Sequence, residues 1–159
     1  MIPDAAHAIG WKANDFTLQG IDGKTYSLAE VRGPKGTLVV FICNHCPYVK
    51  ASISRIVAEA NALRQIGIGT IAIMPNDTES YREDSFDNMK AFAARHAFSF
   101  PYVIDTTQDV ARAYDAQCTP DFRRSMLQVM LLACVEAPVG GQNSWFQPTS
   151  TPCFLKAPT

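Results

Sequence analysis

The chain has 159 residues, of which 47% are hydrophobic and 18% are charged, and its formal net charge is -1. This length predicts one domain with a sizeable buried core. Because acids and bases are interspersed and nearly balanced, the composition argues against nucleic acid or a membrane surface as the main partner. There is no apolar run near the ~20 residues of a membrane span and no secretory pattern at the start. We therefore expect a cytoplasmic protein.

The first predicted elements are a hairpin, a strand and a helix. Residues 15–28, "DFTLQGIDGKTYSL", are typical of a hairpin with Asp22 and Gly23 in its turn. The apolar run at residues 39–42 predicts a buried strand. From Pro47 onward the apolar residues follow helical spacing, which predicts a helix. The residues on this spacing are Val49, Ile53, Ile56, Val57, Ala60 and Leu63.

Strands and helices continue to alternate in the second half. Residues 70–74 predict another strand, and a polar loop follows. Ser85 is a suitable cap for a helix that carries Phe86, Met89, Phe92 and Ala93 on one face. "FPYVID" predicts a short strand, and "TQDVARAYDAQ" predicts a short helix that starts at Thr106 or Thr107. This order predicts an α/β fold, with a central sheet flanked by helices on both faces.

The most informative motif is Cys43-Asn44-His45-Cys46, which stands where the strand ends and the helix begins. Five cysteines, two of them spaced CxxC, favour redox or metal chemistry over a disulfide framework. Pro47 suits the first helical position, which places Cys46 at the N-cap. The exposed amides and the helix dipole stabilise a thiolate there. His45, if protonated, adds a second positive charge for either thiolate.

Two nearby thiols can form a small disulfide ring and open it again, which is the basis of thiol–disulfide exchange. The alternatives are inert packing, which we expect for Cys134 and Cys153, and metal binding. A structural zinc site needs four ligands. Cys43, His45, Cys46 and Cys118 could supply them, but the chain has no second CxxC. We therefore predict no metal and no bound cofactor.

Other polar residues of the chain are not expected to form sites. His7 and His96 are predicted to be surface residues, and the acidic loop from Asp77 to Asp84 is predicted to be solvated rather than to hold a cation.

These motifs resemble a known family. "CNHCP" at a strand–helix junction, followed by "CTPDF", resembles the thioredoxin fold. The motifs "FICNHCPYVK", "ND…YREDS…NMK" and "YDAQCTPDF" are similar to a small bacterial branch of the alkyl hydroperoxide reductase/thiol-specific antioxidant (AhpC/TSA, peroxiredoxin-like) group. The similarity runs from about residue 14 to residue 122. It implies a thioredoxin-like fold with a central mixed sheet.

The resemblance also implies a substrate-binding segment. In this fold a Thr-Pro dipeptide with a cis peptide bond lies beside the redox cysteines, and Thr119-Pro120 matches it. A cis proline there offers the preceding backbone to an incoming chain or sulfur substrate. Cys118 precedes this dipeptide and is a candidate third redox partner.

The resemblance allows two registers for the cysteine pair. Aligned as an ordinary CxxC motif, Cys43 attacks the substrate and Cys46 resolves the mixed disulfide. In the other register Cys46-Pro47 occupies the attacking position, Val49 replaces the usual second cysteine, and Cys43 serves from the upstream side. Pro47 at the helix start favours Cys46 as the nucleophile.

Two departures from the family pattern concern the chemistry. Peroxidases of the group carry Pro-x-x-x-Thr-x-x-Cys, but Val39 and Cys43 stand at the Pro and Thr positions here, which argues against peroxide reduction. Thioredoxin keeps a buried acid in the strand before its cysteines. That strand is apolar here, so proton transfer must come from elsewhere, with His45 and water as candidates.

The resemblance stops after Phe122, so we divide the chain into a thioredoxin-like domain, residues 1–122, and an atypical tail, residues 123–159. The expected hairpin and last helix are missing from the tail. One hypothesis is a reading-frame shift, which would expose a sheet edge and an apolar face. The other is a divergent tail whose "SMLQVMLLACV" forms a strand or helix against that face. Low order is predicted from about Pro138 onward.

The sequence thus predicts a thiol–disulfide oxidoreductase with redox or antioxidant activity. Its substrate would be a disulfide in a protein or small molecule, and its electrons would come from a thiol donor. The alternatives are a thiol peroxidase, a metal-binding or redox-sensing module without turnover, and an inactive copy.

Overall fold

Six strands and their connecting helices form the part of the chain that the computed structural model describes, residues 13–126. In chain order the elements are β1 (Thr17–Gly20), β2 (Thr25–Ser27), α1 (Leu28–Val31), β3 (Gly36–Phe41), α2 (Pro47–Gln65), β4 (Ile68–Met74), the 3-10 turn η2 (Arg82–Asp84), α3 (Phe86–Arg95), β5 (Tyr102–Ile104), α4 (Asp109–Ala113) and β6 (Asp121–Met126). Within residues 13–126, none of the helices has the length and apolar character needed to cross a membrane.

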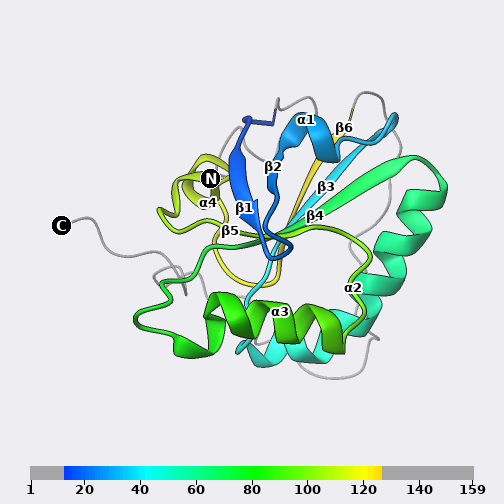
Figure 1. The fold of residues 1–159 in the computed structure, drawn as a ribbon. Coiled ribbons are helices and arrows are strands. Elements are labelled where there is room, and N and C mark those ends of the chain that lie inside the picture. Colours follow the sequence, from blue (N-terminus) through cyan, green and yellow to red (C-terminus); the bar gives the residue numbers. More distant parts are fainter. Residues whose placement is uncertain (1–12, 127–159) are drawn as a thin grey trace, which may run out of the picture.

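The strands form a mixed sheet (Figure 1). Four of them are hydrogen-bonded in the order β2-β1-β5-β4, and β3 pairs with β6. The Ile42 N–H donates to Ile73 O at 3.0 Å, which joins β3 to β4. The pairing of β4 with β5 is parallel, whereas β1 with β2, β1 with β5 and β3 with β6 are antiparallel. The predicted α/β fold with a central mixed sheet is therefore confirmed.

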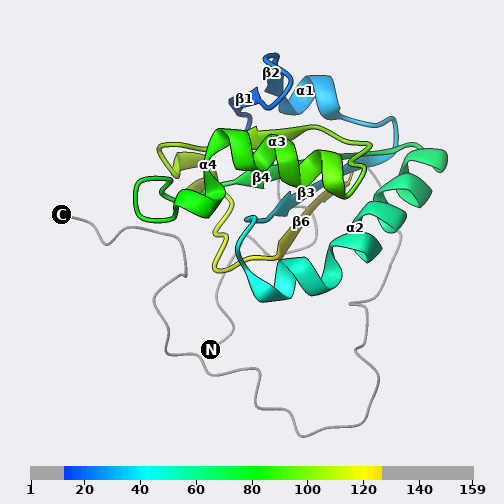
Figure 2. The ribbon, with the colours of Figure 1, turned by 60° about the horizontal axis from the view of Figure 1, so that its bottom comes forward.

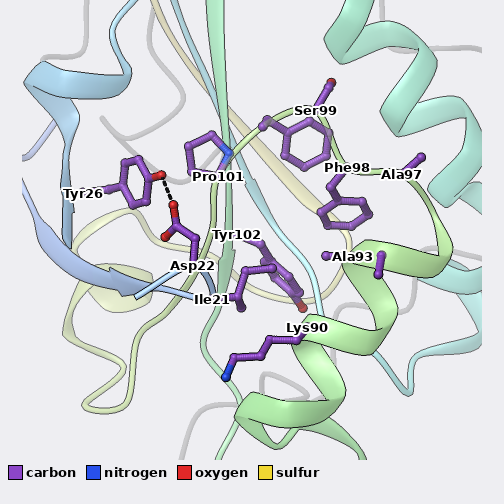
Figure 3. A pocket seen from close by; sticks show the side chains of 12 residues that line it. Ile21, Asp22, Tyr26, Lys90, Ala93, Ala97, Phe98, Ser99, Pro101 and Tyr102 are labelled. Atoms are coloured by element: carbon purple, nitrogen blue, oxygen red, sulfur yellow. Dashed lines mark hydrogen bonds between the residues drawn. The ribbon is translucent and has the colours of Figure 1, made fainter. Parts of the chain in front are cut away.

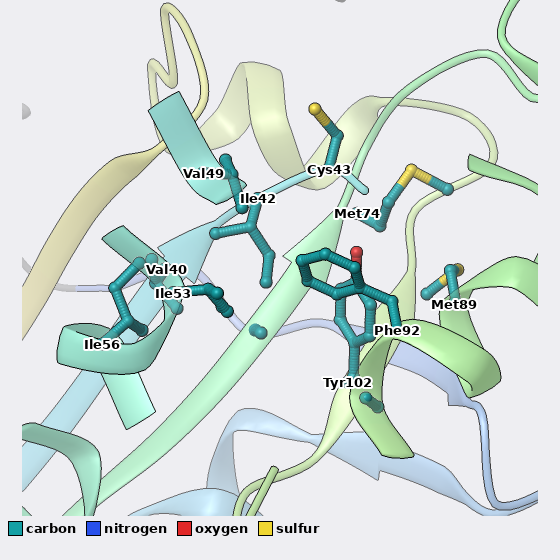
Figure 4. Packing of buried hydrophobic residues seen from close by; sticks show 12 residues of the cluster. Val40, Ile42, Cys43, Val49, Ile53, Ile56, Met74, Met89, Phe92 and Tyr102 are labelled. Carbon is teal, nitrogen blue, oxygen red and sulfur yellow. The ribbon is translucent and has the colours of Figure 1, made fainter. Parts of the chain in front are cut away.

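Alternate residues of the central strands pack on opposite faces of the sheet, as the pleat requires. Val40 and Ile42 of the β3 segment face α2 and α3, together with Met74 and Tyr102. Figure 4 shows this cluster, with Cys43 at one end of it. Val39 and Phe41 face the other way, against Phe16, Ala111 and Tyr114. Both faces of β3 are covered, which suits its apolar residues 38–41. The helices α2 and α3 share one side of the sheet (Figures 1 and 2).

The predicted hairpin is confirmed, with β1 and β2 joined through Asp22 and Gly23. Gly23 has a φ of +82°, a left-handed conformation that glycine adopts without steric cost. The Asp22 carboxylate accepts hydrogen bonds from the Lys24 N–H at 3.1 Å and the Tyr26 hydroxyl at 2.7 Å. These contacts fix the turn.

Ser85 caps α3 as predicted, since its hydroxyl accepts a hydrogen bond from the Asn88 N–H. The predicted start of α4 at Thr106 or Thr107 is wrong, because that helix begins at Asp109. Gln108 has a φ of 62°, a left-handed conformation that cannot continue a helix. The buried Asp105 accepts a hydrogen bond from the Ala111 N–H at 2.9 Å and so holds the first turn in this later position.

The last strand, β6, crosses the boundary that we predicted after Phe122. Its register runs antiparallel to β3 from Phe41 opposite Asp121 to Gly36 opposite Met126. β6 therefore includes Ser125 and Met126, the first two residues of the "SMLQVMLLACV" segment. The domain boundary and the two hypotheses for the tail stay predictions. The predictions for Pro138 onward, for His7, and for Cys134 and Cys153 lie outside the described residues.

We predict that Ile53→Ala lowers the free energy of unfolding by about 2–5 kcal/mol, the range found for deleting a large buried aliphatic side chain. Ile53 is 1% exposed and packs between α2 and the sheet. The measurement is denaturant unfolding followed by circular dichroism. Ser54→Ala is the matched control because Ser54 is the exposed neighbour on the same helix. Equal stability of the two variants would contradict the packing described here.

Candidate active site

The site lies where β3 ends and α2 begins. Cys46 is the N-cap of α2 with φ -60° and ψ 124°, and Pro47 occupies the first turn, as predicted. The Cys46 side chain makes no capping hydrogen bond, and it is half-buried. Its sulfur therefore lies at the positive end of a 19-residue helix, where backbone amides favour negative charge.

Cys43 has a different environment from Cys46. It is 1% exposed and belongs to the cluster under α2 and α3. Burial raises the pKa of the Cys43 thiol to about 11, and the charge of Asp84 contributes in the same direction, while the hydrogen bond with Thr119 partly offsets both. Cys43 is therefore a protonated thiol at neutral pH.

Both sulfurs contact Thr119. Cys43 Sγ lies 3.2 Å from Thr119 Oγ1, and Cys46 Sγ lies 3.3 Å from the Thr119 carbonyl oxygen. The predicted cis peptide bond between Thr119 and Pro120 is confirmed. The structure thus brings together Cys43, Cys46 and Thr119, which are up to 76 residues apart in the chain.

Cys118 lies beside this arrangement with a different orientation. Its side chain is exposed, and its Sγ approaches the Pro120 carbonyl oxygen at 4.0 Å. The role of a third redox partner stays a prediction for this residue.

Asp84 is a site residue that the sequence reasoning missed. The prediction that the acidic loop is solvated is wrong here, because Asp84 is 0% exposed. Asp84 Oδ1 accepts hydrogen bonds from the Asn44 N–H at 2.7 Å and the His45 N–H at 3.3 Å. Asp84 Oδ2 contacts His45 Nδ1 at 2.7 Å and accepts a hydrogen bond from Asn76 Nδ2. The loop after β4 folds back through η2 and places this carboxylate beneath the cysteine loop.

Two other acids of the same loop, Glu79 and Glu83, are exposed as predicted. Asp77 is half-buried. A signal for Asp84 did exist, since it lies within the "YREDS" motif and directly precedes the helix cap Ser85.

His45 is held by this carboxylate. Its side chain is 31% exposed, and its ring stacks on Tyr81 at 4.8 Å with an interplanar angle of 6°. When the ring is protonated, its charge is paired with Asp84 rather than left for the thiolates, which differs from the sequence expectation. Cys43 Sγ, a ring nitrogen of His45 and a carboxylate oxygen of Asp84 all lie within 4.8 Å of one another.

The loop between the cysteines is also held by hydrogen bonds of the Asn44 side chain. The Tyr102 hydroxyl donates to Asn44 Oδ1 at 3.0 Å, and Asn44 Nδ2 donates to the Glu83 carbonyl oxygen at 3.1 Å. These bonds satisfy the buried side chain of Asn44 and connect the loop to β5 and η2.

A surface pocket of about 580 Å³ lies away from the two cysteines, between the hairpin turn, α3 and the segment before β5. Figure 3 shows Tyr26, Asp22 and Lys90 among aromatic side chains. Neither Cys43 nor Cys46 lines it. The residues with redox chemistry therefore lie outside this pocket.

Comparison with known proteins identifies the family. Residues 9–136 match the model of the AhpC/TSA family. The chain is 27% identical over 111 residues to the thiol-disulfide oxidoreductase ResA of Halalkalibacterium halodurans, a match that covers 70% of this chain and 58% of that protein.

Two solved structures support the same fold. An uncharacterized conserved protein from Geobacillus kaustophilus is 43% identical with a TM-score of 0.73, over 75% of this chain and 64% of that one. A thioredoxin family protein from Chlorobium tepidum is 23% identical with a TM-score of 0.53, over 64% and 63% of the two chains. The chain thus spans less than two thirds of each of these three proteins. The fold is thioredoxin-like.

We predict that alkylation of Cys43 in a Cys46→Ser variant increases about tenfold per pH unit between pH 8 and 10, because only the thiolate reacts. The rate should not level off below the Cys43 pKa of about 11. The measurement is mass spectrometry of the Cys43 peptide after brief treatment with iodoacetamide.

The control for this titration is the same variant in denaturant, where the curve should level off near the ordinary cysteine pKa of about 8.5. A plateau near pH 8 in the folded protein would contradict the burial of Cys43.

Proposed function

Because the chain belongs to the AhpC/TSA family, we propose that it is a thiol–disulfide oxidoreductase in which Cys46 attacks the substrate and Cys43 resolves the mixed disulfide. The observation that carries the proposal is that both sulfurs contact Thr119, one buried and one accessible at a helix N-terminus.

The assignment of the two roles follows from accessibility. An attacking sulfur must reach a disulfide of another molecule, and Cys46 is the less buried of the pair. A resolving sulfur needs only to reach its neighbour, which suits the buried thiol of Cys43. Val49, which stands where many relatives have their second cysteine, is 0% exposed and packs in the core. This supports the register with Cys46-Pro47 at the attacking position.

The proposed reaction has two exchanges. The Cys46 thiolate attacks a substrate disulfide, which forms a mixed disulfide and releases one substrate thiol. Cys43 then loses its proton and attacks Cys46 Sγ, which forms the Cys43–Cys46 disulfide and releases the second thiol. An external thiol donor returns the pair to the reduced form. Thr119 and Pro120 would hold the substrate chain beside the sulfurs, and a reducing compartment such as the cytoplasm would suit the supply of electrons.

The peroxidase alternative has less support. The threonine position of the peroxidase pattern is occupied by Cys43, and its proline position by Val39, which is 0% exposed within β3. Neither side chain can donate a strong hydrogen bond to a peroxide oxygen.

Metal binding has one observation in its favour, the convergence of Cys43, His45 and Asp84 within 4.8 Å. The donor set fits zinc in type, since sulfur, imidazole and carboxylate are its usual ligands. However, the Asp84 oxygens already accept four hydrogen bonds, and a cation would have to break some of them. We therefore favour the redox function.

We predict that Cys46→Ser lowers the rate of disulfide reduction by at least about a hundredfold, because it removes the attacking sulfur. Cys43→Ser should instead accumulate a mixed disulfide at Cys46. The measurements are reduction of a protein disulfide with dithiothreitol as the electron donor, and intact-protein mass spectrometry. Cys153→Ser is the control and should keep its activity within about twofold.

A mixed disulfide that forms on Cys43 in the Cys46→Ser variant, at the wild-type rate, would reverse the assigned roles. Stoichiometric zinc that purifies with the protein and blocks both thiols would favour the metal alternative.

A further inference from the structure

We infer that His45 is the base that takes the proton of Cys43 in the resolving step, and that Asp84 positions the His45 ring for this transfer. The inference rests on the proposed function and adds to it the proton acceptor that the apolar strand β3 does not contain. Cys43 is sealed from solvent at 1% exposure, so its proton needs an acceptor within the site. Because the pKa of the Cys43 thiol is raised, the thiol does not readily lose its proton at neutral pH without such an acceptor.

Asp84 is close to Cys43, but its carboxylate is already occupied. A carboxylate has about four acceptor positions on its two oxygens. Here Oδ1 has the Asn44 and His45 backbone amides, and Oδ2 has Asn76 Nδ2 and His45 Nδ1. All four positions are therefore filled, and the carboxylate cannot accept the Cys43 proton without losing a bond. Thr119 Oγ1 lies 3.2 Å from Cys43 Sγ, but a hydroxyl is too weak a base to keep the proton. The remaining base beside Cys43 is the imidazole of His45.

The contact with Asp84 also fixes which nitrogen of His45 is available. A carboxylate accepts, so the neutral ring donates its Nδ1–H to Asp84 Oδ2 and keeps an unprotonated Nε2. The stacked Tyr81 ring holds the imidazole plane. Cys43 Sγ, a ring nitrogen of His45 and a carboxylate oxygen of Asp84 lie within 4.8 Å of one another, a separation that one bridging water can span to carry the proton. The 31% exposure of the His45 side chain then lets the ring exchange protons with solvent.

The titratable groups around Cys43 come from four segments. Cys46 comes from the start of α2, His45 from the loop, Asp84 from η2 and Tyr102 from β5. Burial raises the pKa of Tyr102 well above its ordinary value, so Tyr102 stays neutral and cannot serve as the base.

The step balances in protons and electrons. The Cys43 S–H proton passes to His45 Nε2, and the resulting thiolate attacks Cys46 Sγ. The Cys43–Cys46 bond forms, the Cys46–substrate bond breaks, and the substrate sulfur leaves with the electron pair. The imidazolium then returns the proton to the leaving thiolate. The two cysteines are oxidised and the substrate disulfide is reduced to two thiols.

The test separates the two exchanges with dithionitrobenzoate, whose coloured thiol is released once in each exchange. The full chain would carry Cys118→Ser, Cys134→Ser and Cys153→Ser, so that only Cys43 and Cys46 react. His45→Ala should slow the second release at least about tenfold at pH 7 and leave the first within about threefold. Its second release should rise about tenfold per pH unit, a steeper dependence than in the parent, because the thiolate must then form without the base. Added imidazole should restore part of the lost rate.

His96→Ala is the matched control, since it removes a histidine of α3's end without touching the site. Asp84→Asn should slow the second release as well, and if that variant does not fold, His45→Ala and the imidazole rescue decide the question. An unchanged second release in His45→Ala would overturn the inference and leave the proposed function standing. A first release no faster than that of a free thiol would overturn the proposed function itself.

Discussion

The buried carboxylate of Asp84 is the constraint on which the geometry of the site depends. A carboxylate without partners is expensive to bury, so Asp84 is tolerable only because four donors converge on it. Three of those donors belong to Asn44 and His45 in the cysteine loop, and the fourth belongs to Asn76 after β4. Since β3 and β4 are neighbours in the sheet, the loops that follow them meet at one edge, and the carboxylate joins them there. The conformation between Cys43 and Cys46 is therefore set by a residue about forty positions away.

The different character of the two cysteines follows from this fixed loop. Hydrogen bonds from Asn44 and His45 to Asp84 fix the loop. Cys43 therefore stays in the core cluster just after β3, and Cys46 stands at the N-cap of α2. Burial keeps the first sulfur protonated, whereas the second lies at the N-cap of α2, at the positive end of the helix dipole. Thr119 contacts both sulfurs through two different oxygens, its hydroxyl and its carbonyl. One loop thus gives two chemically unlike thiols without a charged residue inside the strand.

Local patterns in the sequence were enough to predict the elements whose ends carry their own signals. Pro47 after Cys46, Ser85 before α3 and Asp22-Gly23 in the hairpin each act through contacts within a few residues. The local patterns failed where contacts between residues far apart in the chain set the structure. The later start of α4 depends on the left-handed Gln108 and the buried Asp105. The inward position of Asp84, among several acids in one loop, depends on amides from another part of the chain. Residues 123–126 looked unlike the family pattern, yet β3 offers them an edge to pair with.

The location of the acid also explains why β3 can be apolar on both faces. Val39 and Val40 are both 0% exposed, because α4 and the hairpin side cover one face and α2 and α3 cover the other. A carboxylate on either face would displace side chains of a closely packed core and would find few donors there. In the loop, by contrast, backbone amides can donate hydrogen bonds to the carboxylate. The His45 side chain that contacts the carboxylate is 31% exposed and therefore reaches solvent. An acid in the loop rather than in the strand therefore leaves the packing of the core intact. In the proposed mechanism it also positions His45 to take the proton of the buried Cys43.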